Sequence, residues 1–273
     1  MKRYSLGSHA LIDSFKKNYN QNNQFGYVFY DISGILMDGN FNFTAVVEYF
    51  ELDVNESFSI PAIKNDIFAS VIVAHRLKLP LFIIVYKEKT DYFEIFDFFN
   101  NISFTKSIIH PTPNNCEFLQ WWKQYKGTQQ YKPFYNNNYL SWKINQVFNT
   151  GVTKWGGDVD GIIMDNQRII SLVEFRKSTY ETVDKYNPLS YYKGTQNRAG
   201  DYMTWLPLIL LKKALNSNLY LVTLSEVDTS HYGIAEILDN DQSNLYLKFD
   251  VTPFETCTDN IDFIFNILSN RIH

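Results

Sequence analysis

The sequence predicts an α/β protein made of two tandem domains, each a mixed sheet flanked by helices. Three observations lead to this prediction. Strand-like and helix-like patterns alternate along the chain, their order occurs twice, and a polar segment separates the two occurrences. The predicted domains cover residues 1–127 and 138–273. With 273 residues, 45% of them apolar, the chain can build two domains that each have a core.

The repeat is clearest in two short stretches that begin at Asp31 and Asp158. In "DISGILMD" and "DVDGIIMD", five of the eight positions are identical. After one residue inserted in the first copy, Glu48 corresponds to Glu174. Chance similarity of two αβ units is the alternative. However, the segments that follow keep one order: an apolar helical stretch, a buried strand, a polar turn and another strand. We therefore infer an internal duplication.

The domain boundary is predicted between Lys126 and Asn138, where Gly, Pro and Asn occur without an apolar period. Each copy is expected to end in a helix, and the second copy also to begin with one. The positions that define these helices are Phe118, Trp121, Trp122 and Tyr125; Leu140, Ile144, Val147 and Phe148; and Ile261, Ile264, Phe265 and Leu268. A further helix is expected to begin at Asp201, a good N-cap residue, with Pro207 in its interior.

A hairpin is predicted over Val159 to Lys177, and acids stand at its open end. Strand alternation places Glu174 and Arg176 on one face of the second strand. Because the start of one strand of a hairpin lies beside the end of the other, Asp160 and Glu174 are expected to approach each other. Two carboxylates so placed repel unless a cation lies between them. Mg²⁺ accepts such oxygen ligands and usually keeps several waters.

This arrangement, an Asp followed after 13 residues by Glu-x-Arg, resembles the PD-(D/E)xK nuclease superfamily, which has the restriction-endonuclease-like fold. The resemblance rests on "VDGII" and "SLVEFRKS" in the order helix, hairpin, helix, strand, over roughly residues 137–240. It implies that Asp160 and Glu174 bind Mg²⁺ or Mn²⁺. Asp158 is a further candidate for the metal site, where it would hold a metal-bound water. The resemblance also implies that the protein hydrolyses phosphodiester bonds, with DNA favoured over RNA as the substrate.

The sequence departs from the family pattern at one position, because Arg176 stands where the family has Lys and Lys177 follows one residue later. Arg stays protonated and does not act as a base, but it can orient water or stabilise negative charge on a phosphate. Lys177 reaches the site only if a bulge redirects it. The candidate catalytic residues are therefore Asp160, Glu174, Arg176 and Lys177.

A different class of function remains open on the same residues. The acids near the hairpin can be turn residues in contact with solvent, and Arg176 can simply pair with Glu174. The alternative is a catalytically inactive nuclease-fold protein that binds nucleic acid or a protein partner. An active enzyme needs a further cation near the metal, whereas a binding protein does not.

The first copy lacks two of the candidate groups. Ser33 stands at the position of Asp160 and Phe50 at that of Arg176, while Glu48 is retained. A degenerate copy is expected to lose a ligand and a cation together, so we expect the first domain to be structural or to bind substrate. The chain would then act as a monomeric pseudo-dimer or as a homodimer, either of which suits the approximate twofold symmetry of duplex DNA.

The connection from Ser178 to Gly200 is longer than most loops and is rich in Tyr and basic residues, which makes it a functional candidate. Basic side chains can contact phosphates, and aromatic ones can stack on bases. The alternative is a packed surface loop whose tyrosines cover the edge of a core. The candidate nucleic-acid contacts are Lys185, Tyr192, Lys193, Gln196 and Arg198.

Composition narrows the function classes further. A net charge of −4 excludes a general polyanion binder but permits a local basic patch. Cys116 and Cys257 lack histidines at ligand spacing, so no zinc site is expected. The longest apolar run, "LPLFIIVY", is too short to span a bilayer, and the N-terminal segment lacks the apolar core of a signal peptide. We therefore expect no membrane association and a cytoplasmic protein.

Overall fold

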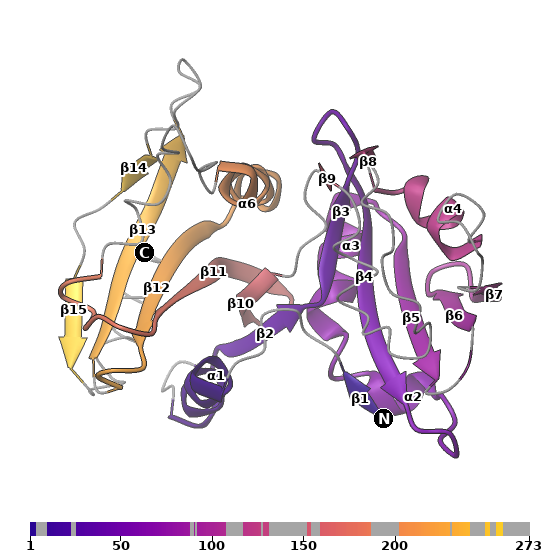
Figure 1. Cartoon of the computed structure of the whole chain (residues 1–273), viewed down its shortest axis with the longest axis horizontal. Helices are drawn as coiled ribbons and strands as arrows, with labels where there is room; N and C mark the ends of the chain where they lie inside the picture. Colours follow the sequence, from indigo (N-terminus) through magenta and orange to yellow (C-terminus); the bar gives the residue numbers. More distant parts are fainter. Residues whose placement is uncertain are drawn as a thin grey trace. The chain divides into compact units, whose positions relative to one another are not determined.

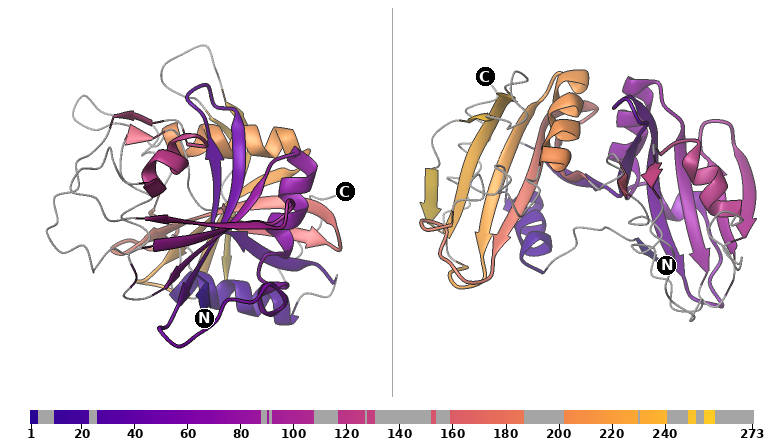
Figure 2. Two further views of the ribbon diagram at one scale, coloured as in Figure 1. Left: turned by 90° about the vertical axis from the view of Figure 1, so that its right-hand side faces the viewer. Right: turned by 45° about the horizontal axis from the view of Figure 1, so that its top comes forward.

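The computed structural model describes residues 1–3, 10–22, 26–87, 90, 92–107, 117–126, 128–130, 152–153, 159–186, 202–229, 231–240, 249–251 and 255–258. Contacts divide the chain into two compact units. Unit 1 comprises Met1–Gly7 and Ile32–Asp158, and unit 2 comprises Ser8–Asp31 and Val159–His273. Each unit is a twisted mixed sheet with helices packed on it (Figure 1 and Figure 2). The mixed α/β architecture is as predicted, but residues 8–31 belong to unit 2 and not to the first domain.

Unit 1 has a six-stranded sheet in the order β1-β4-β5-β6-β7, with β3 paired to β4. Its strands are β1 (Lys2–Arg3), β3 (Gly34–Met37), β4 (Phe43–Leu52), β5 (Leu81–Lys87), β6 (Tyr92–Asp97) and β7 (Ile102–Ser107). Strands β4 and β5 are parallel, and α2 (Ile60–Ile63) and α3 (Phe68–Leu77) form the crossover between them. The short strands β8 (Thr128–Gln130) and β9 (Val152–Thr153) form a two-stranded sheet.

Hydrophobic clusters cover both faces of the unit 1 sheet, which is why β5 is buried along nearly its whole length. On one face, α4 (Glu117–Lys123) packs Phe118 and Trp121 against the strands, with the Trp121 ring centroid 5.1 Å from that of Phe82. On the opposite face, α2 and α3 cover Phe50 and Val85 (Figure 1). Helix α4 confirms the helix predicted from Phe118 onward.

Unit 2 has a seven-stranded sheet in the order β14-β13-β12-β11-β10-β2, with β15 paired to β13. Its strands are β2 (Val28–Ile32), β10 (Val159–Asp165), β11 (Arg168–Ser178), β12 (Asn218–Ser225), β13 (His231–Asn240), β14 (Phe249–Val251) and β15 (Glu255–Thr258). Strands β11 and β12 are parallel and joined through α6 (Tyr202–Leu215), which is the helix predicted after Asp201. The helices predicted at residues 140–148 and 261–268 lie outside the described residues.

Helix α1 (Ala10–Asn22) supplies part of the core of unit 2. Its buried side chains Ile12, Phe15 and Tyr19 pack on strand residues, and the ring centroid of Phe15 lies 5.2 Å from that of Phe175. This packing of aromatic rings is the physical reason why the N-terminal helix belongs to unit 2. Helix α6 packs on the other face of the sheet, against β11, β12 and β13 (Figure 1).

The two units share one connectivity, in which an antiparallel hairpin leads through helices to a parallel strand and then to an antiparallel one. The hairpin registers also agree. Gly34 pairs with Val47 in unit 1, and Gly161 pairs with Val173 in unit 2. Both hairpins have a register shift immediately before a methionine, Met37 in unit 1 and Met164 in unit 2. The β10–β11 hairpin closes through a turn in which Asn166 adopts a φ of 52°, a conformation that Asn tolerates well.

Candidate functional site

The β10–β11 hairpin brings the two predicted acids of unit 2 to one place. Gly161 pairs with Val173, so Asp160 and Glu174, the next residues on each strand, stand across from each other. Val173 and Phe175 belong to the core on the α1 side. Glu174 therefore points to the opposite face of β11, the face on which α6 packs. The predicted approach of the two carboxylates follows from this register.

The Asp160 carboxylate is held by the backbone of the neighbouring strand. Its Oδ2 accepts a hydrogen bond of 2.9 Å from the N–H of Phe175. The residue is 9% exposed, and burial raises the pKa of its carboxyl above the usual value. The Phe175 N–H and the positive charges of Lys16 and Arg176 oppose this increase in the pKa, whereas the negative charge of Asp31 adds to it. Asp160 is thus a carboxylate whose charged form is disfavoured unless a further cation comes near.

Glu174 and Arg176 form an ion pair along the same strand. The Nη1 atom of Arg176 lies 3.0 Å from Oε1 of Glu174, and Glu174 is only 5% exposed. The guanidinium carbon lies 5.6 Å from the ring centroid of Trp205, which projects from the first turn of α6. The indole ring and Glu174 together fix the position of the guanidinium. Three of the predicted catalytic residues, Asp160, Glu174 and Arg176, therefore lie close together.

Lys177 is not brought to this cluster. Its Nζ atom forms an ion pair with Glu226 at 2.5 Å. The pairing of β11 with β12 is continuous from Ser171 to Ser178, so no bulge redirects Lys177 toward the face of Glu174. The side chain follows strict alternation and stays on the other face. Of the two basic residues at this end of β11, Arg176 and not Lys177 thus lies at the site.

The N-terminal segment contributes two charged residues near Asp160 that sequence reasoning did not find. Lys16 of α1 forms an ion pair of 3.2 Å with Asp31 of β2, and both side chains are partly buried. Strand β2 is the neighbour of β10 in the sheet, so Asp31 stands on the strand beside that of Asp160. The sequence alignment had assigned Asp31 to the first copy. A sequence signal for Lys16 is absent, because its link to Asp160 depends on the packing of α1.

A close contact fixes this part of the sheet. A Cβ atom on Gly161 would lie 2.2 Å from the ring of Phe29, so only glycine allows the ring to cover the strand at this point. The Nζ atom of Lys16 lies 6.0 Å from the centroid of the same ring. Phe29 thus connects α1 to the residue that follows Asp160. Gly161 thus has a packing role in unit 2.

The remaining predicted site residues are placed only in part. Asp158 and the loop residues Tyr192, Lys193, Gln196 and Arg198 lie outside the described residues. Lys185 is described, and it is exposed in a turn in which its N–H donates to the carbonyl of Thr182 at 3.0 Å. The predicted nucleic-acid contacts therefore stay predictions.

In unit 1, Glu48 stands at the position that corresponds to Glu174, and neighbouring protein groups bind its carboxylate. Glu48 is 0% exposed, and its carboxylate accepts two hydrogen bonds of 2.8 Å from Arg3 on β1. The hydroxyl of Ser33 donates a third at 2.6 Å, and that of Ser70 on α3 donates a fourth. Ser33 occupies the position of Asp160, and a guanidinium from the N-terminal strand supplies the positive charge. Glu48 is therefore satisfied by the protein itself.

The donor set in unit 2 suits a hard divalent cation. Two facing carboxylates are the ligands that Mg²⁺ takes from proteins, with waters completing the octahedron. Within the described ranges, no group of three or more His, Cys, Asp or Glu side chains is arranged around a common point. Asp160 and Glu174 are the two facing carboxylates of this site that could act as ligands.

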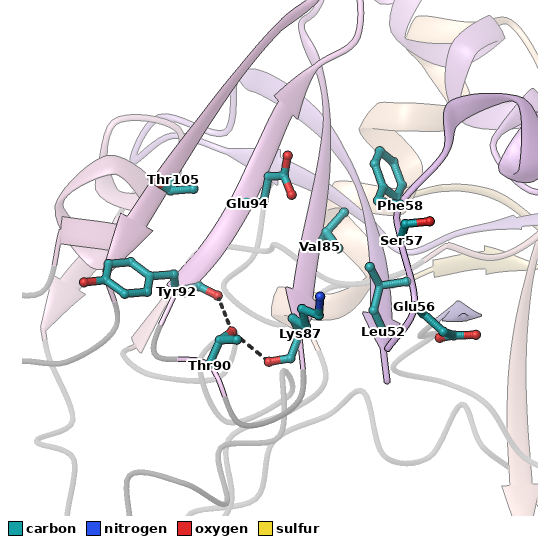
Figure 3. A pocket seen from close by; sticks show the side chains of 10 residues that line it. All are labelled: Leu52, Glu56, Ser57, Phe58, Val85, Lys87, Thr90, Tyr92, Glu94 and Thr105. Atoms are coloured by element: carbon teal, nitrogen blue, oxygen red, sulfur yellow. Dashed lines mark hydrogen bonds between the residues drawn. The ribbon is translucent and has the colours of Figure 1, made fainter. Parts of the chain in front are cut away.

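Unit 1 also contains an open cavity of about 510 Å³ at the ends of β4 and β5 (Figure 3). It is lined by Leu52, Glu56, Ser57, Phe58, Val85, Lys87, Thr90, Tyr92, Glu94 and Thr105. Thr90 Oγ1 donates to the carbonyl of Lys87 at 2.8 Å, which fixes one wall. Apolar side chains and charges of both signs share the lining, and none of the sequence-predicted site residues contributes to it.

Comparison with known proteins does not identify the chain. No family model and no curated protein matches the sequence. Among solved structures, it is similar to the C-terminal domain of the sex pheromone staph-cAM373 precursor from Staphylococcus aureus, at 9% identity and a TM-score of 0.15. That match covers 78% of this chain and 65% of the other. A structure of the sex pheromone staph-cAM373 precursor matches at 11% identity and a TM-score of 0.17, covering 94% and 84% of the two chains. Likenesses this slight carry no argument about fold or function.

Among the described residues, no helix combines the length and apolar character that a membrane span requires.

Proposed function

We propose that unit 2 is a metal-dependent nuclease domain with a restriction-endonuclease-like fold. The observation that carries the proposal is the position of Asp160 and Glu174, which stand across from each other on β10 and β11 with Arg176 on the same face. The connectivity supports it, since the hairpin is followed by α6 and the parallel strand β12. This is the element order that the resemblance to PD-(D/E)xK nucleases implies.

In this proposal each residue of the site has a separate role in hydrolysis. Asp160 and Glu174 would hold a divalent cation, Mg²⁺ or Mn²⁺. The bound cation would lower the pKa of a water and neutralise charge on the phosphate. Arg176, held between Glu174 and Trp205, stabilises the negative charge that develops on the phosphate oxygens. The Phe175 N–H orients the Asp160 carboxylate, which limits its rotation before substrate binds.

Unit 1 is, in this proposal, a degenerate copy of the same domain. The shared hairpin register and connectivity support an internal duplication. At Glu48, the Arg3 guanidinium stands where a metal ion would bind, and Ser33 replaces one of the two acids. Unit 1 would therefore keep the fold without catalytic activity. We propose DNA as the substrate, a pseudo-dimer or homodimer as the acting form, and the cytoplasm as the location.

The test is cleavage of supercoiled and linear DNA and of RNA with Mg²⁺, with Mn²⁺ and with EDTA. Cleavage that needs the metal and disappears in Glu174→Gln supports the proposal. Asp165→Asn is the matched control, because Asp165 is an acid of the same hairpin that lies at the turn and pairs with Arg168 at 3.4 Å. A folded parent that cleaves none of the three substrates with either metal would contradict the proposal.

The second candidate is a catalytically inactive protein that keeps the nuclease fold and binds nucleic acid or a protein. The Glu174–Arg176 ion pair favours it, since the guanidinium already neutralises one of the two acids. The cavity in unit 1 gives such a protein a place to bind a ligand (Figure 3). Binding to an oligonucleotide without cleavage under any of the metal conditions would decide for this candidate.

A further inference from the structure

A buried hydroxyl on β12 lies beside the cation of the candidate site. Thr223 pairs with Arg176 in the parallel register of β11 and β12. The side chain of Thr223 is 0% exposed, and within the described part of the chain its Oγ1 makes no hydrogen bond. A buried hydroxyl without a partner lowers stability, so its presence calls for a ligand or a partner.

The alternation of β12 shows which face this hydroxyl occupies. Tyr220, Val222 and Leu224 belong to the core cluster on the α1 side. Thr223 lies between them in sequence and therefore points to the opposite face. That face also carries Glu174 and Arg176, so the hydroxyl and the guanidinium are neighbours on one surface of the sheet.

Helix α6 adds a third favourable element. It leads from the end of β11 to the start of β12, and its first turn places Trp205 against the guanidinium of Arg176. The N-terminal turn of this 14-residue helix therefore lies within side-chain reach of Arg176. Helix N-termini attract anions through their backbone N–H groups.

We propose that Thr223, Arg176 and the N-terminus of α6 form a binding site for a phosphate group. A guanidinium carries five N–H donors, so Arg176 can hold Glu174 and a phosphate oxygen together. Thr223 Oγ1 donates its hydrogen to a second oxygen of the same phosphate. The identity of this phosphate as part of a nucleic-acid backbone rests on the proposed function, whereas phosphate binding itself requires no metal.

Calorimetry in EDTA tests the site with two probes, inorganic phosphate and a short single-stranded oligonucleotide. We expect the parent to bind, and Thr223→Val to weaken binding about tenfold or more through loss of a hydrogen bond to a charged group. Arg176→Gln should weaken it also. Ser171→Ala is the matched control, because Ser171 is a second buried hydroxyl without a partner among the described residues, and it shares the α1 face with Val173. The Ser171→Ala variant should bind both probes with the affinity of the parent.

Thermal melts separate binding from folding. Thr223→Val should melt at or above the temperature of the parent, because the substitution keeps the shape and removes an unsatisfied hydroxyl. A lower melting temperature, an unchanged affinity of Thr223→Val, or a parent that binds neither probe would overturn the proposal. A parent that binds inorganic phosphate through Thr223 but never binds or cuts nucleic acid would uphold the phosphate site and remove the nuclease function.

Discussion

Oδ2 of Asp160 accepts a 2.9 Å hydrogen bond from the backbone N–H of Phe175, at the point where β10 and β11 begin to pair. The bond holds an acid whose charged form burial disfavours. A buried carboxyl of this kind makes the folded state less stable when it ionises, and a nearby cation would stabilise its charged form. Both consequences can be measured.

The first prediction concerns stability against pH. Because burial raises the pKa of Asp160 in the folded state above its unfolded value, its contribution to stability is present below the unfolded pKa and is lost as pH rises through the folded pKa. Asp160→Asn keeps an acceptor for the Phe175 N–H and cannot ionise. We expect it to melt several degrees above the parent at pH 8 and level with it near pH 4. Asp165→Asn controls for the same change of acid to amide on this hairpin. A less stable Asp160→Asn variant at pH 8 would contradict the prediction.

The second prediction concerns metal binding. Calorimetry with Mn²⁺ should show binding that Asp160→Ala and Glu174→Ala each abolish. Asp160 must be deprotonated to act as a ligand, so affinity should increase as pH rises and proton release should accompany binding. Asp165→Ala serves as the control for nonspecific binding to surface acids. If both site variants kept the affinity of the parent, the ligand assignment would fail.

The third prediction concerns Arg176. If this residue acts through its charge, Arg176→Lys should retain or raise the cleavage rate, while Arg176→Ala should lose about 2–4 kcal/mol of transition-state stabilisation, as for a lost oxyanion donor. Single-turnover rates at saturating metal measure this directly. Lys177→Ala is the control, because Lys177 pairs with Glu226 and not with Asp160 or Glu174. An equal loss of rate in the two alanine variants would show that Lys177 also reaches the substrate.

The fourth prediction concerns the acid of unit 1. Arg3→Met leaves the buried Glu48 carboxylate without its guanidinium and should lower the free energy of unfolding by about 3–5 kcal/mol. Glu48→Gln keeps acceptors for Ser33 and Ser70, so adding it to Arg3→Met should recover part of the loss. Urea denaturation of the two single variants and the double variant gives the coupling energy. Strict additivity would mean that Arg3 and Glu48 do not stabilise each other.

The fifth prediction concerns Lys126, three residues beyond the end of α4. It is 2% exposed, and its Nζ atom lies 5.8 Å from the Trp122 ring centroid. Burial lowers the pKa of Lys126 to about 8. Its contribution to stability is therefore present above the unfolded pKa of 10.5 and lost as pH falls through about 8. Lys126→Met should stabilise the protein by about 2–3 kcal/mol at pH 7, and the gain should shrink toward pH 10. Urea midpoints measure it, with the exposed Lys64→Met as control. A gain that is the same at both pH values would show that packing and not charge is responsible.

The sequence predicted the parts of this protein that depend on local patterns. The β10–β11 hairpin, α4 and α6 follow from periodicity and turn residues, and the approach of Asp160 to Glu174 follows from the hairpin alone. The contributions of Lys16 and Arg3 could not be predicted, because each depends on where an N-terminal element packs. The similarity between the two stretches of sequence shows which of their residues correspond. It does not show that α1, which precedes the first stretch, packs in unit 2.

The packing of Phe15 on Phe175 joins two residues that are about 160 positions apart in the chain. At the usual ribosomal rates, α1 is made roughly 10–30 s before the strand that covers it. During that interval its apolar side must stay in water, or be held by a chaperone, while the strands of unit 1 are synthesised. Contacts of such long range slow folding. We therefore expect unit 2 to fold late. Fragments cut between the two sequence repeats should aggregate, because the N-terminal fragment would carry α1 without β11, and the C-terminal fragment would carry β11 without α1.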